Sequence, residues 1–507
     1  MICCMRSGLA VVLVLIFPSS AVAADFARSF VWGTAISGFQ SEMGGRPANA
    51  DRGSDWYVWT HDRENRRSGV VTRDLPERGP GHWNQFARDV GLAAEALHQD
   101  ALRISIEWSR IFPHSTKRVR GLHDLDRLAN RAALRHYRAV LRRIRAGGMR
   151  TFVTLNHYTL PSWLHDPLEV RRKLSGRDPD APLPAGIRRG GWLDSDSVVE
   201  FRKYAAYLAW KVGRLVDYWA PINEPVVVAA SGYVNVAGAI EGNFPPGVLS
   251  FFAANRVVRN LARANAAAYR AIHRRDRRAR VGPVHNMVAF TPADPSSQKD
   301  RRGAEHADYL FNRLYLNAVV RGEYDRDADG LIEAGERVPR RAGRADFIGV
   351  NYYFRGRVTG LDAPLSRRIQ VLDFLPSTFY RTRADLDRPA CPTTCTEFGT
   401  EIYPEGFGEM LRTAGSYGLP LIVTENGIAD ADDDQRPGYL VDHLRVLRDA
   451  VRAGTARVRG YFHWSLMDNF EWAEGYAPKF GLYDIRRRPR PSARVYAAIS
   501  RTNALPP

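Results

Sequence analysis

The sequence has little cysteine, little lysine and no second long apolar run after its N-terminus. Beyond the first 24 residues, no segment approaches the roughly 20 consecutive apolar residues of a transmembrane helix, so membrane insertion is not expected. The 507 residues also contain no internal repeat, no low-complexity tract and no recognisable linker. A single domain is therefore expected from residue 25 to residue 507, despite the length of the chain.

The first 24 residues have the pattern of a secretory signal peptide. Arg6 precedes an apolar run from Leu9 to Phe17, and the small residues Ala21-Val22-Ala23 precede Ala24. Cleavage is predicted near Ala23 or Ala24. The mature protein is expected to be soluble and either secreted or periplasmic.

The cysteines indicate one structural bond. Cys3 and Cys4 belong to the predicted signal peptide, which leaves Cys391 and Cys395 in an oxidising compartment. A disulfide between these two is the favoured interpretation, and two free thiols are the alternative. A metal site is disfavoured because the neighbouring residues offer no further ligands.

The scarcity of lysine changes the meaning of a strongly positive charge. The formal net charge is +18, but only six of the 73 basic residues are lysines and 67 are arginines. The arginines are scattered over many predicted helices, without clustering or interleaved aromatic residues. Compositional bias therefore explains the charge better than a nucleic-acid-binding surface does. Attraction to anionic glycans or to a cell envelope is a secondary interpretation.

Short apolar runs alternate with segments of helical spacing along the whole chain. Strands are predicted at residues 30–33, 102–105, 151–155, 219–223, 280–284, 347–351, 421–425 and 458–464. Helices are predicted at residues 86–97, 132–144, 198–212, 251–272, 306–319 and 439–451. Eight alternations are typical of a single α/β TIM barrel, (β/α)₈, and the surplus over about 250 residues fits long βα loops. The fifth strand has the weakest pattern because Pro283 lies within it.

Two of the predicted strands end on a glutamate. Residues 421–424 lead to Glu425, and residues 219–222 lead through Asn223 to Glu224. Two carboxylates, one held protonated and one ionised, are the groups that cleave a glycosidic bond. Each motif alone also fits a strand followed by a tight turn. In a barrel, however, both would lie at the carboxyl ends of the strands, where the chemistry of this fold takes place.

Other strand ends carry polar or aromatic side chains where core packing would favour Val or Leu. These residues are Arg103, His157, Asn351, Tyr353 and Trp464. Singly, such residues usually cap a helix or strand, or lie in the core with their polar groups hydrogen-bonded. Around one barrel mouth they suit a hydroxyl-rich ligand, because amides and carboxylates bind hydroxyls and tryptophan packs on the C–H face of a sugar.

Together the motifs resemble glycoside hydrolase family 1, the β-glucosidase and β-galactosidase family, from about residue 29 to residue 500. The motifs are Phe30-Val31-Trp32-Gly33-Thr34-Ala35, Gln40-Ser41-Glu42, Arg103-Ile104-Ser105, Trp108-Ser109-Arg110-Ile111, Asn223-Glu224-Pro225, Asn351-Tyr352-Tyr353, Thr424-Glu425-Asn426-Gly427, Trp464-Ser465-Leu466 and Asp468-Asn469-Phe470-Glu471-Trp472. The stretches 40–44, 209–211 and 425–430 are most similar to the archaeal β-glycosidase branch.

The resemblance implies a retaining enzyme that hydrolyses unphosphorylated β-linked glucosides, galactosides or fucosides through a covalent glycosyl-enzyme, with a small-molecule β-glycoside or an oligosaccharide as substrate. It implies that Glu224 is the general acid/base and Glu425 the nucleophile, with Arg103, Tyr353 and Asn351 in support. The sugar-binding residues that it implies are Gln40, His157, Asn223, Trp464, Glu471 and Trp472. No cofactor is implied for catalysis, and the oligomeric state is left open. A transglycosylating enzyme of the same fold and a non-catalytic glycan-binding protein are the alternatives.

The chain departs from the family pattern in two places. His157-Tyr158-Thr159-Leu160-Pro161 stands where the family usually has His-Trp-Asp-Leu-Pro, and Gly399-Thr400-Glu401 stands where it usually has Gly-Trp-Glu. The small side chain of Thr400 would open the outer subsites, unless the neighbouring loop from Cys391 to Cys395 refills that space.

Residues 325–336 match an EF-hand calcium loop, which the family does not suggest. Aspartates occupy loop positions 1, 3 and 5, glycine position 6 and glutamate position 12. The expected ligands of a structural calcium ion are Asp325, Asp327, Asp329, the Leu331 carbonyl and Glu336. A solvated acidic loop is the alternative.

Overall fold

The structure is a computed structural model that describes residues 24–235, 242–382 and 386–506. The predicted signal peptide, residues 1–24, therefore lies outside the described residues except for Ala24.

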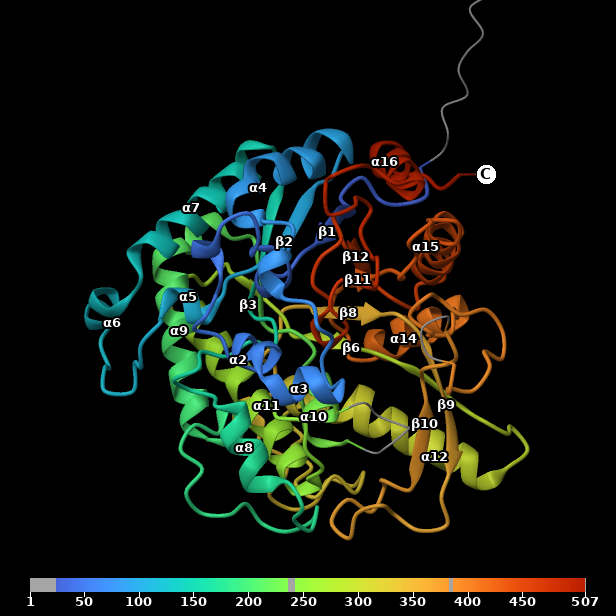
Figure 1. The fold of residues 1–507 in the computed structure, drawn as a ribbon. Coiled ribbons are helices and arrows are strands. Elements are labelled where there is room, and N and C mark those ends of the chain that lie inside the picture. The colour runs from blue at the N-terminus through green and yellow to red at the C-terminus, as the bar shows by residue number, and fades with distance from the viewer. Residues whose placement is uncertain (1–23, 236–241, 383–385, 507) are drawn as a thin grey trace, which may run out of the picture.

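Parallel strands form the centre of the molecule (Figure 1). They are β1 (Val31–Ala35), β2 (Ala101–Ser105), β3 (Arg150–Asn156), β4 (Tyr218–Ile222), β5 (Arg280–Val281), β6 (Val284–Asn286), β8 (Ile348–Tyr352), β11 (Leu421–Asn426) and β12 (Val458–Trp464). Their hydrogen-bonded order is β5-β4-β3-β2-β1-β12-β11-β8-β6. All eight predicted strands are present, and the predicted (β/α)₈ barrel is confirmed.

The fifth strand is split into β5 and β6, and its two halves close the barrel. β5 pairs with β4, whereas β6 pairs with β8. Pro283, between the halves, has no N–H to donate, but its carbonyl accepts a 2.8 Å hydrogen bond from the Gly349 N–H. A Cβ on Gly282 would lie 2.4 Å from the carbonyl oxygen of Phe347, so this close approach requires glycine.

Helices surround the strands on their outer side. They are α1 (Gly38–Ser41), α2 (Asp55–His61), α3 (Arg63–Ser68), α4 (His82–Gly91), α5 (Trp108–Ile111), α6 (Leu122–Leu128), α7 (Arg131–Ala146), α8 (Pro167–Leu174), α9 (Asp196–Val212), α10 (Pro225–Tyr233), α11 (Phe251–His273), α12 (Gln298–Asp308), α13 (Leu314–Leu316), α14 (Pro404–Gly415), α15 (Arg436–Arg452) and α16 (Pro491–Thr502). In the described part of the chain, none combines the length and the apolar character that crossing a bilayer requires.

The predicted helical segments are all helical, with some shifts at their ends. The segment predicted at residues 306–319 begins earlier, with α12 at Gln298, and continues through π-helical turns at Tyr309–Arg313 and Asn317–Arg321. The helices α14 and α16 were not predicted. Each starts with a proline at its first position, where the missing N–H costs no hydrogen bond.

Local sequence explains how a barrel helix such as α7 forms. The Asn130 side chain accepts hydrogen bonds from the Ala132 and Ala133 N–H groups at 3.0 and 3.2 Å, which caps the helix. Tyr137, Leu141 and other buried residues recur at helical spacing and pack toward the strands.

An apolar layer fills the barrel near the amino ends of its strands. Phe152 is at its centre, with ring centroids 5.7 Å from Phe347 and 5.6 Å from Phe462. The Arg103 guanidinium lies 5.7 Å from the centre of the Phe152 ring. The polar residues at the carboxyl ends of the strands therefore lie on top of an apolar layer.

A small second sheet, which was not predicted, stands outside the barrel. It consists of β7 (Ala289–Pro292), β9 (Arg355–Gly360) and β10 (Phe374–Ser377), in the order β10-β9-β7. Figure 1 shows β9 and β10 beside α12, at the lower right and away from the barrel strands. The sheet and α12 share an apolar cluster that includes Val358, Phe374 and Ala307. The long loops after the fifth and sixth strands thus have a core of their own.

Candidate active site

A cavity of about 370 Å³ opens at the carboxyl ends of the strands, and Glu224 and Glu425 both line it. The predicted residues His157, Tyr353, Trp464, Glu471 and Trp472 line the same cavity. The structure places the other predicted residues, Gln40, Arg103, Asn223 and Asn351, behind this surface, where each is at most 1% exposed. Gln40 bonds to Glu471 and Asn223 bonds to His157, so both lie directly against residues that line the cavity.

Glu425 lies at the end of β11, after a fully buried apolar run. The pairing of β11 with β8 shifts register between Val423 and Glu425, and this bulge sets the direction of the carboxylate. One carboxylate oxygen, Oε1, accepts a 2.5 Å hydrogen bond from Arg103 Nη1. The other, Oε2, accepts a 2.6 Å hydrogen bond from the Tyr353 hydroxyl. The charge on Glu425 is thus matched by a buried cation.

Glu224 lies between β4 and α10 and has uncharged partners. Its Oε1 accepts hydrogen bonds from Asn351 Nδ2 at 2.7 Å and from Asn286 Nδ2 at 3.1 Å. Its Oε2 accepts a hydrogen bond from the Tyr158 hydroxyl. Pro225 begins α10 directly after it, so the glutamate lies at the turn from strand to helix.

Arg103 connects the surroundings of the two glutamates. Besides Glu425, its guanidinium donates to Asn223 Oδ1 at 2.7 Å and to Thr154 Oγ1 at 3.1 Å. Asn351 Nδ2 also donates to Asn223 Oδ1, at 3.2 Å, as well as to Glu224. One network of hydrogen bonds therefore fixes the positions of both carboxylates.

A third carboxylate, that of Glu471, lies at the side of the cavity formed by β1 and β12. Its Oε1 accepts a 3.2 Å hydrogen bond from Trp464 Nε1, and its Oε2 accepts a 3.0 Å hydrogen bond from Gln40 Nε2. The His157 ring stacks on Trp464 at 5.8 Å and on Trp472 at 5.9 Å. This end offers a carboxylate and aromatic faces, which suit the hydroxyls and the C–H face of a sugar ring.

Three of the eight non-glycine residues with positive φ in the described chain lie at this site. Tyr158, Glu224 and Trp472 have φ values of 70°, 45° and 53°, in the left-handed region that non-glycine residues rarely adopt. Each such residue costs on the order of 1–3 kcal/mol and persists where the surrounding structure holds it. Since all three line the cavity, the strain places side chains there.

Burial governs the protonation of the groups around the cavity. It raises the pKa of Glu425 to about 7, although the Arg103 charge and the Tyr353 hydroxyl act to lower it and Glu224 adds to the rise. Burial also raises the pKa of Glu471 to about 8. Burial and the Arg103 charge lower the pKa of His157, which keeps its imidazole neutral. Burial holds the pKa of Tyr353 well above its usual value, so its hydroxyl remains a donor.

Two partners of Glu224 escaped prediction. Asn286 ends the fifth strand, whose pattern Pro283 interrupts, so its place at a strand end was not recognised. Tyr158 belongs to a stretch in which the chain departs from the family, and its contact depends on a left-handed turn. An amide just after an apolar run was the available signal for Asn286.

The structure joins Cys391 and Cys395 by a disulfide, with Cα atoms 6.1 Å apart. The loop is attached to Glu401, whose Oε1 accepts a 2.6 Å hydrogen bond from Thr393 Oγ1. Glu401 is itself buried and paired with Arg355 and Arg357. Thr400 lines the cavity, but no residue of the disulfide loop does so in the described chain. The space beside Thr400 is therefore not refilled by that loop.

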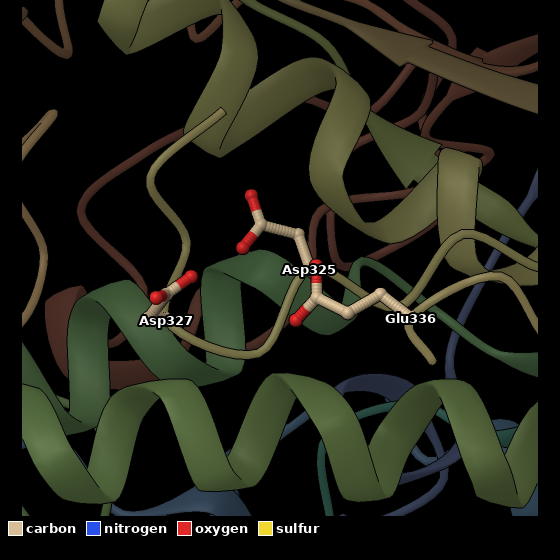
Figure 2. Close-up of side chains that lie close together, drawn as sticks. All are labelled: Asp325, Asp327 and Glu336. Carbon is tan, nitrogen blue, oxygen red and sulfur yellow. The ribbon is translucent and has the colours of Figure 1, made fainter. Parts of the chain in front are cut away.

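The acidic loop at residues 325–336 brings carboxylates together outside this cavity. Oxygens of Asp325, Asp327 and Glu336 lie within 4.8 Å of one another, and Figure 2 shows the three groups facing one another. Asp329 forms a second group, with Asp327 and Glu333, within the same distance. The side chain of Leu331, whose carbonyl was predicted as a ligand, is exposed.

Comparison with known proteins points to one family. The sequence model described as glycosyl hydrolase family 1 matches residues 22–170 and 181–505. A β-galactosidase from Pyrococcus woesei is 37% identical over 497 residues, covering 91% of this chain and 92% of that protein. The structure of a β-glycosidase from Thermosphaera aggregans has a TM-score of 0.81 and 35% identity, covering 95% of this chain and 98% of that one. The structure of a β-glucosidase from Pyrococcus furiosus has a TM-score of 0.79 and 34% identity, and the match covers 96% of this chain and 97% of that one.

Proposed function

Since the chain belongs to glycosyl hydrolase family 1, a family of retaining β-glycosidases, we propose that Glu425 is its nucleophile and Glu224 its general acid/base. The observation that carries this assignment is the contrast between their partners. Glu425 is paired with the Arg103 cation, which favours the ionised form. In the described structure, Glu224 receives hydrogen bonds from two uncharged amides and a hydroxyl. The cation is thus placed at Glu425, where it stabilises the ionised form that a nucleophile needs.

In the first step, ionised Glu425 attacks the anomeric carbon while protonated Glu224 gives its proton to the leaving oxygen. The bond to the aglycone breaks and a glycosyl ester forms on Glu425. In the second step, ionised Glu224 takes a proton from water, which attacks the same carbon and releases the sugar with its β configuration. Arg103 and Tyr353 hold Glu425 in position, first as the attacking and then as the leaving group.

We propose unphosphorylated β-glucosides, β-galactosides or β-fucosides as substrates. A phosphate on the sugar's outer hydroxyls would lie beside the buried Glu471 side chain, which offers it no positive charge in either protonation state. Of the 73 basic residues, no lysine or arginine lines the described cavity, so a phosphate would find no cation there. The relatives from Pyrococcus, named for β-galactosidase and β-glucosidase activity, support the same sugars.

Substitution of the two glutamates tests their roles. Glu425→Gln is expected to reduce turnover of 4-nitrophenyl β-glucoside by several orders of magnitude, because the amide cannot attack. Glu224→Ala is expected to reduce it about 10²–10⁴-fold. Azide should then rescue Glu224→Ala and yield the β-glycosyl azide, identified by NMR. Glu405→Gln, on an exposed residue of α14, serves as the control and should retain full activity. An α-glycosyl azide would refute the retaining assignment.

The Arg103–Glu425 pair makes a prediction about pH. The Arg103 charge lowers the pKa of Glu425, so Arg103→Gln should raise that pKa above about 7. Since the nucleophile must be ionised, the acidic limb of the kcat/KM profile should move to higher pH, with the largest loss of activity below pH 7. Tyr353→Phe should move the limb in the same direction, whereas Arg103→Lys should move it less because the charge remains. An acidic limb that stays in place or moves to lower pH in Arg103→Gln contradicts the assignment.

We also propose that the loop at residues 325–336 binds a structural calcium ion. The spacing of its acidic residues and the convergence of Asp325, Asp327 and Glu336 support the proposal, because Ca²⁺ takes oxygen ligands. Asp325 also accepts hydrogen bonds from the Ala328 and Gly330 N–H groups, at 2.6 and 3.0 Å, which wraps the loop around its carboxylate. Gly330, with φ of 88°, makes the sharp turn at position 6. None of the carboxylates lines the cavity, so the ion would have no part in the reaction.

Thermal unfolding with and without calcium tests the ion site. The free energy of unfolding should rise with calcium, by about 2.7 kcal/mol at 100 times the dissociation constant. Glu336→Gln keeps an oxygen acceptor for the Arg326 N–H but loses the charge, and it should abolish the increase. Asp432→Asn, in a separate acidic group with Glu397 and Asp430, should leave the increase unchanged. An equal Tm in millimolar calcium and in EDTA, with no calcium retained after desalting, would dispose of the site.

We further propose that the protein is exported and cleaved near Ala24. The pattern of residues 1–24 supports export, and so does the disulfide, which is typical of oxidising compartments. Asp25, just after the cleavage point, accepts hydrogen bonds from Arg452 Nη2 and the Leu505 N–H, each at 2.8 Å. A mature chain that begins there would be well anchored.

Mass spectrometry of the protein expressed with its own leader tests this proposal. The mature chain should begin at Ala24 or Asp25. Alkylation under denaturing, non-reducing conditions should label no cysteine, because Cys3 and Cys4 have left and Cys391 and Cys395 are bonded. A chain that retains its leader and is labelled at Cys391 and Cys395 would contradict both export and the bond.

A further inference from the structure

The cavity that holds the two glutamates continues into a large apolar region. Its walls come from α10, from α11, from the turn that follows α12 and from the small outer sheet. We call this region the pouch and define it by six of its lining residues, Val227, Ala230, Phe290, Leu310, Leu314 and Leu372. All except Leu372 are only half-buried, as expected for side chains that border open space. The pouch is therefore unfilled apolar surface inside the active-site cavity.

The pouch and the Glu471 end lie on different sides of the barrel mouth. Glu471 bonds to Trp464 at the end of β12 and to Gln40 after β1. The pouch is built from segments that follow the fourth, fifth and sixth strands. In the barrel order β5-β4-β3-β2-β1-β12-β11-β8-β6, these groups of strands are far apart. A substrate that binds its sugar at Glu471 would extend the rest of the molecule toward the pouch.

The position of the general acid indicates which part of the substrate occupies the pouch. Glu224 protonates the leaving oxygen, so the aglycone must leave on the side of Glu224. The helix α10 begins directly after Glu224, and the Val227 N–H donates to the Glu224 carbonyl at 3.1 Å. Val227 and Ala230 project from the first turns of this helix into the pouch. The first surface that the aglycone meets beyond the acid is thus apolar.

The chemistry of the walls favours an uncharged, apolar aglycone. The charged side chains of the described lining are Glu224, Glu425, Glu471 and Glu474, and no lysine or arginine is among them. Four phenylalanines, Phe354, Phe379, Phe398 and Phe480, add a further aromatic wall, with neighbouring rings 5.4–6.3 Å apart. Polar side chains such as Ser231, Asn255 and Thr378 also line the cavity, but most of the lining is apolar, so a sugar aglycone would bury some hydroxyls without partners. A hydrocarbon aglycone would gain from leaving water.

We propose that the preferred substrates are β-glycosides whose aglycone is a bulky, uncharged hydrocarbon alcohol, and that the pouch is the aglycone site. The proposal rests on the proposed function, because it uses Glu224 as the acid that marks the aglycone side. The small side chain of Thr400 lines the same cavity beside the aromatic wall at Phe398 and leaves room for such an aglycone.

A comparison of three glucosides with the same sugar tests the proposal. We expect kcat/KM for octyl β-D-glucoside, measured below its micelle-forming concentration, to exceed that for cellobiose and for methyl β-D-glucoside at least tenfold. Ala230→Phe should fill the pouch and reduce the ratio of octyl to methyl kcat/KM at least fivefold. Val227→Thr preserves side-chain shape, adds one hydroxyl to the wall and should reduce the ratio in the same direction. Ala132→Phe, which adds the same ring on the exposed start of α7, should not change it.

The outcomes separate this inference from the proposed function. Hydrolysis of cellobiose or methyl β-D-glucoside as fast as octyl β-D-glucoside would overturn the apolar aglycone site and leave the glycosidase assignment intact. An unchanged ratio in Val227→Thr and in folded Ala230→Phe would overturn the placement of the aglycone in the pouch. Absence of hydrolysis of every glucoside, with correctly folded protein, would overturn the proposed function and the inference together.

Discussion

The buried ion pair between Arg103 and Glu425 is the constraint on which the rest of the site depends. The two side chains are 1% and 4% exposed, above the ring of Phe152, so neither charge is solvated by bulk water. Removing one partner of such a pair typically costs about 3–5 kcal/mol, because the other charge stays buried. The guanidinium can hold Glu425 only while its remaining N–H groups bond to Asn223 and Thr154. The strands that carry these residues are far apart in the sequence, and the closed barrel brings their carboxyl ends together.

The cavity has a polar end at this ion pair and an apolar end beyond Glu224. Around Arg103, the barrel mouth is a dense polar network whose donors and acceptors are used by one another and by the glutamates. Past Glu224, the walls come from loops and helices outside the barrel, which pack around their own apolar cluster. The polar end of the cavity is thus built on the barrel strands. The apolar end is built on the segments that follow the fourth, fifth and sixth strands.

The sequence predicted most of what the barrel itself determines. Glu224, Glu425 and Trp464 were identified because an apolar run ends at each of them. The alternation of strands and helices predicted a barrel, in which these strand ends lie together. Asn286 was missed because Pro283 breaks its strand, although the two halves still close the barrel. The outer sheet was missed because its strands are short and pair across long stretches of chain. The contacts among the site residues could not be predicted from their spacing, as the hydrogen bond between Gln40 and Glu471 shows.

Glu425, the proposed nucleophile, is expected to attack the sugar and carry it as an ester. A 2-deoxy-2-fluoro-β-glucosyl fluoride tests it most directly, because the fluorine slows breakdown of the ester more than the good leaving group slows its formation. Peptide mapping of the inactivated protein should find one added fluoroglucosyl group, on the peptide that contains Glu425. Labelling of Glu224 instead, or continued turnover of the reagent with no label on Glu425, would contradict the account.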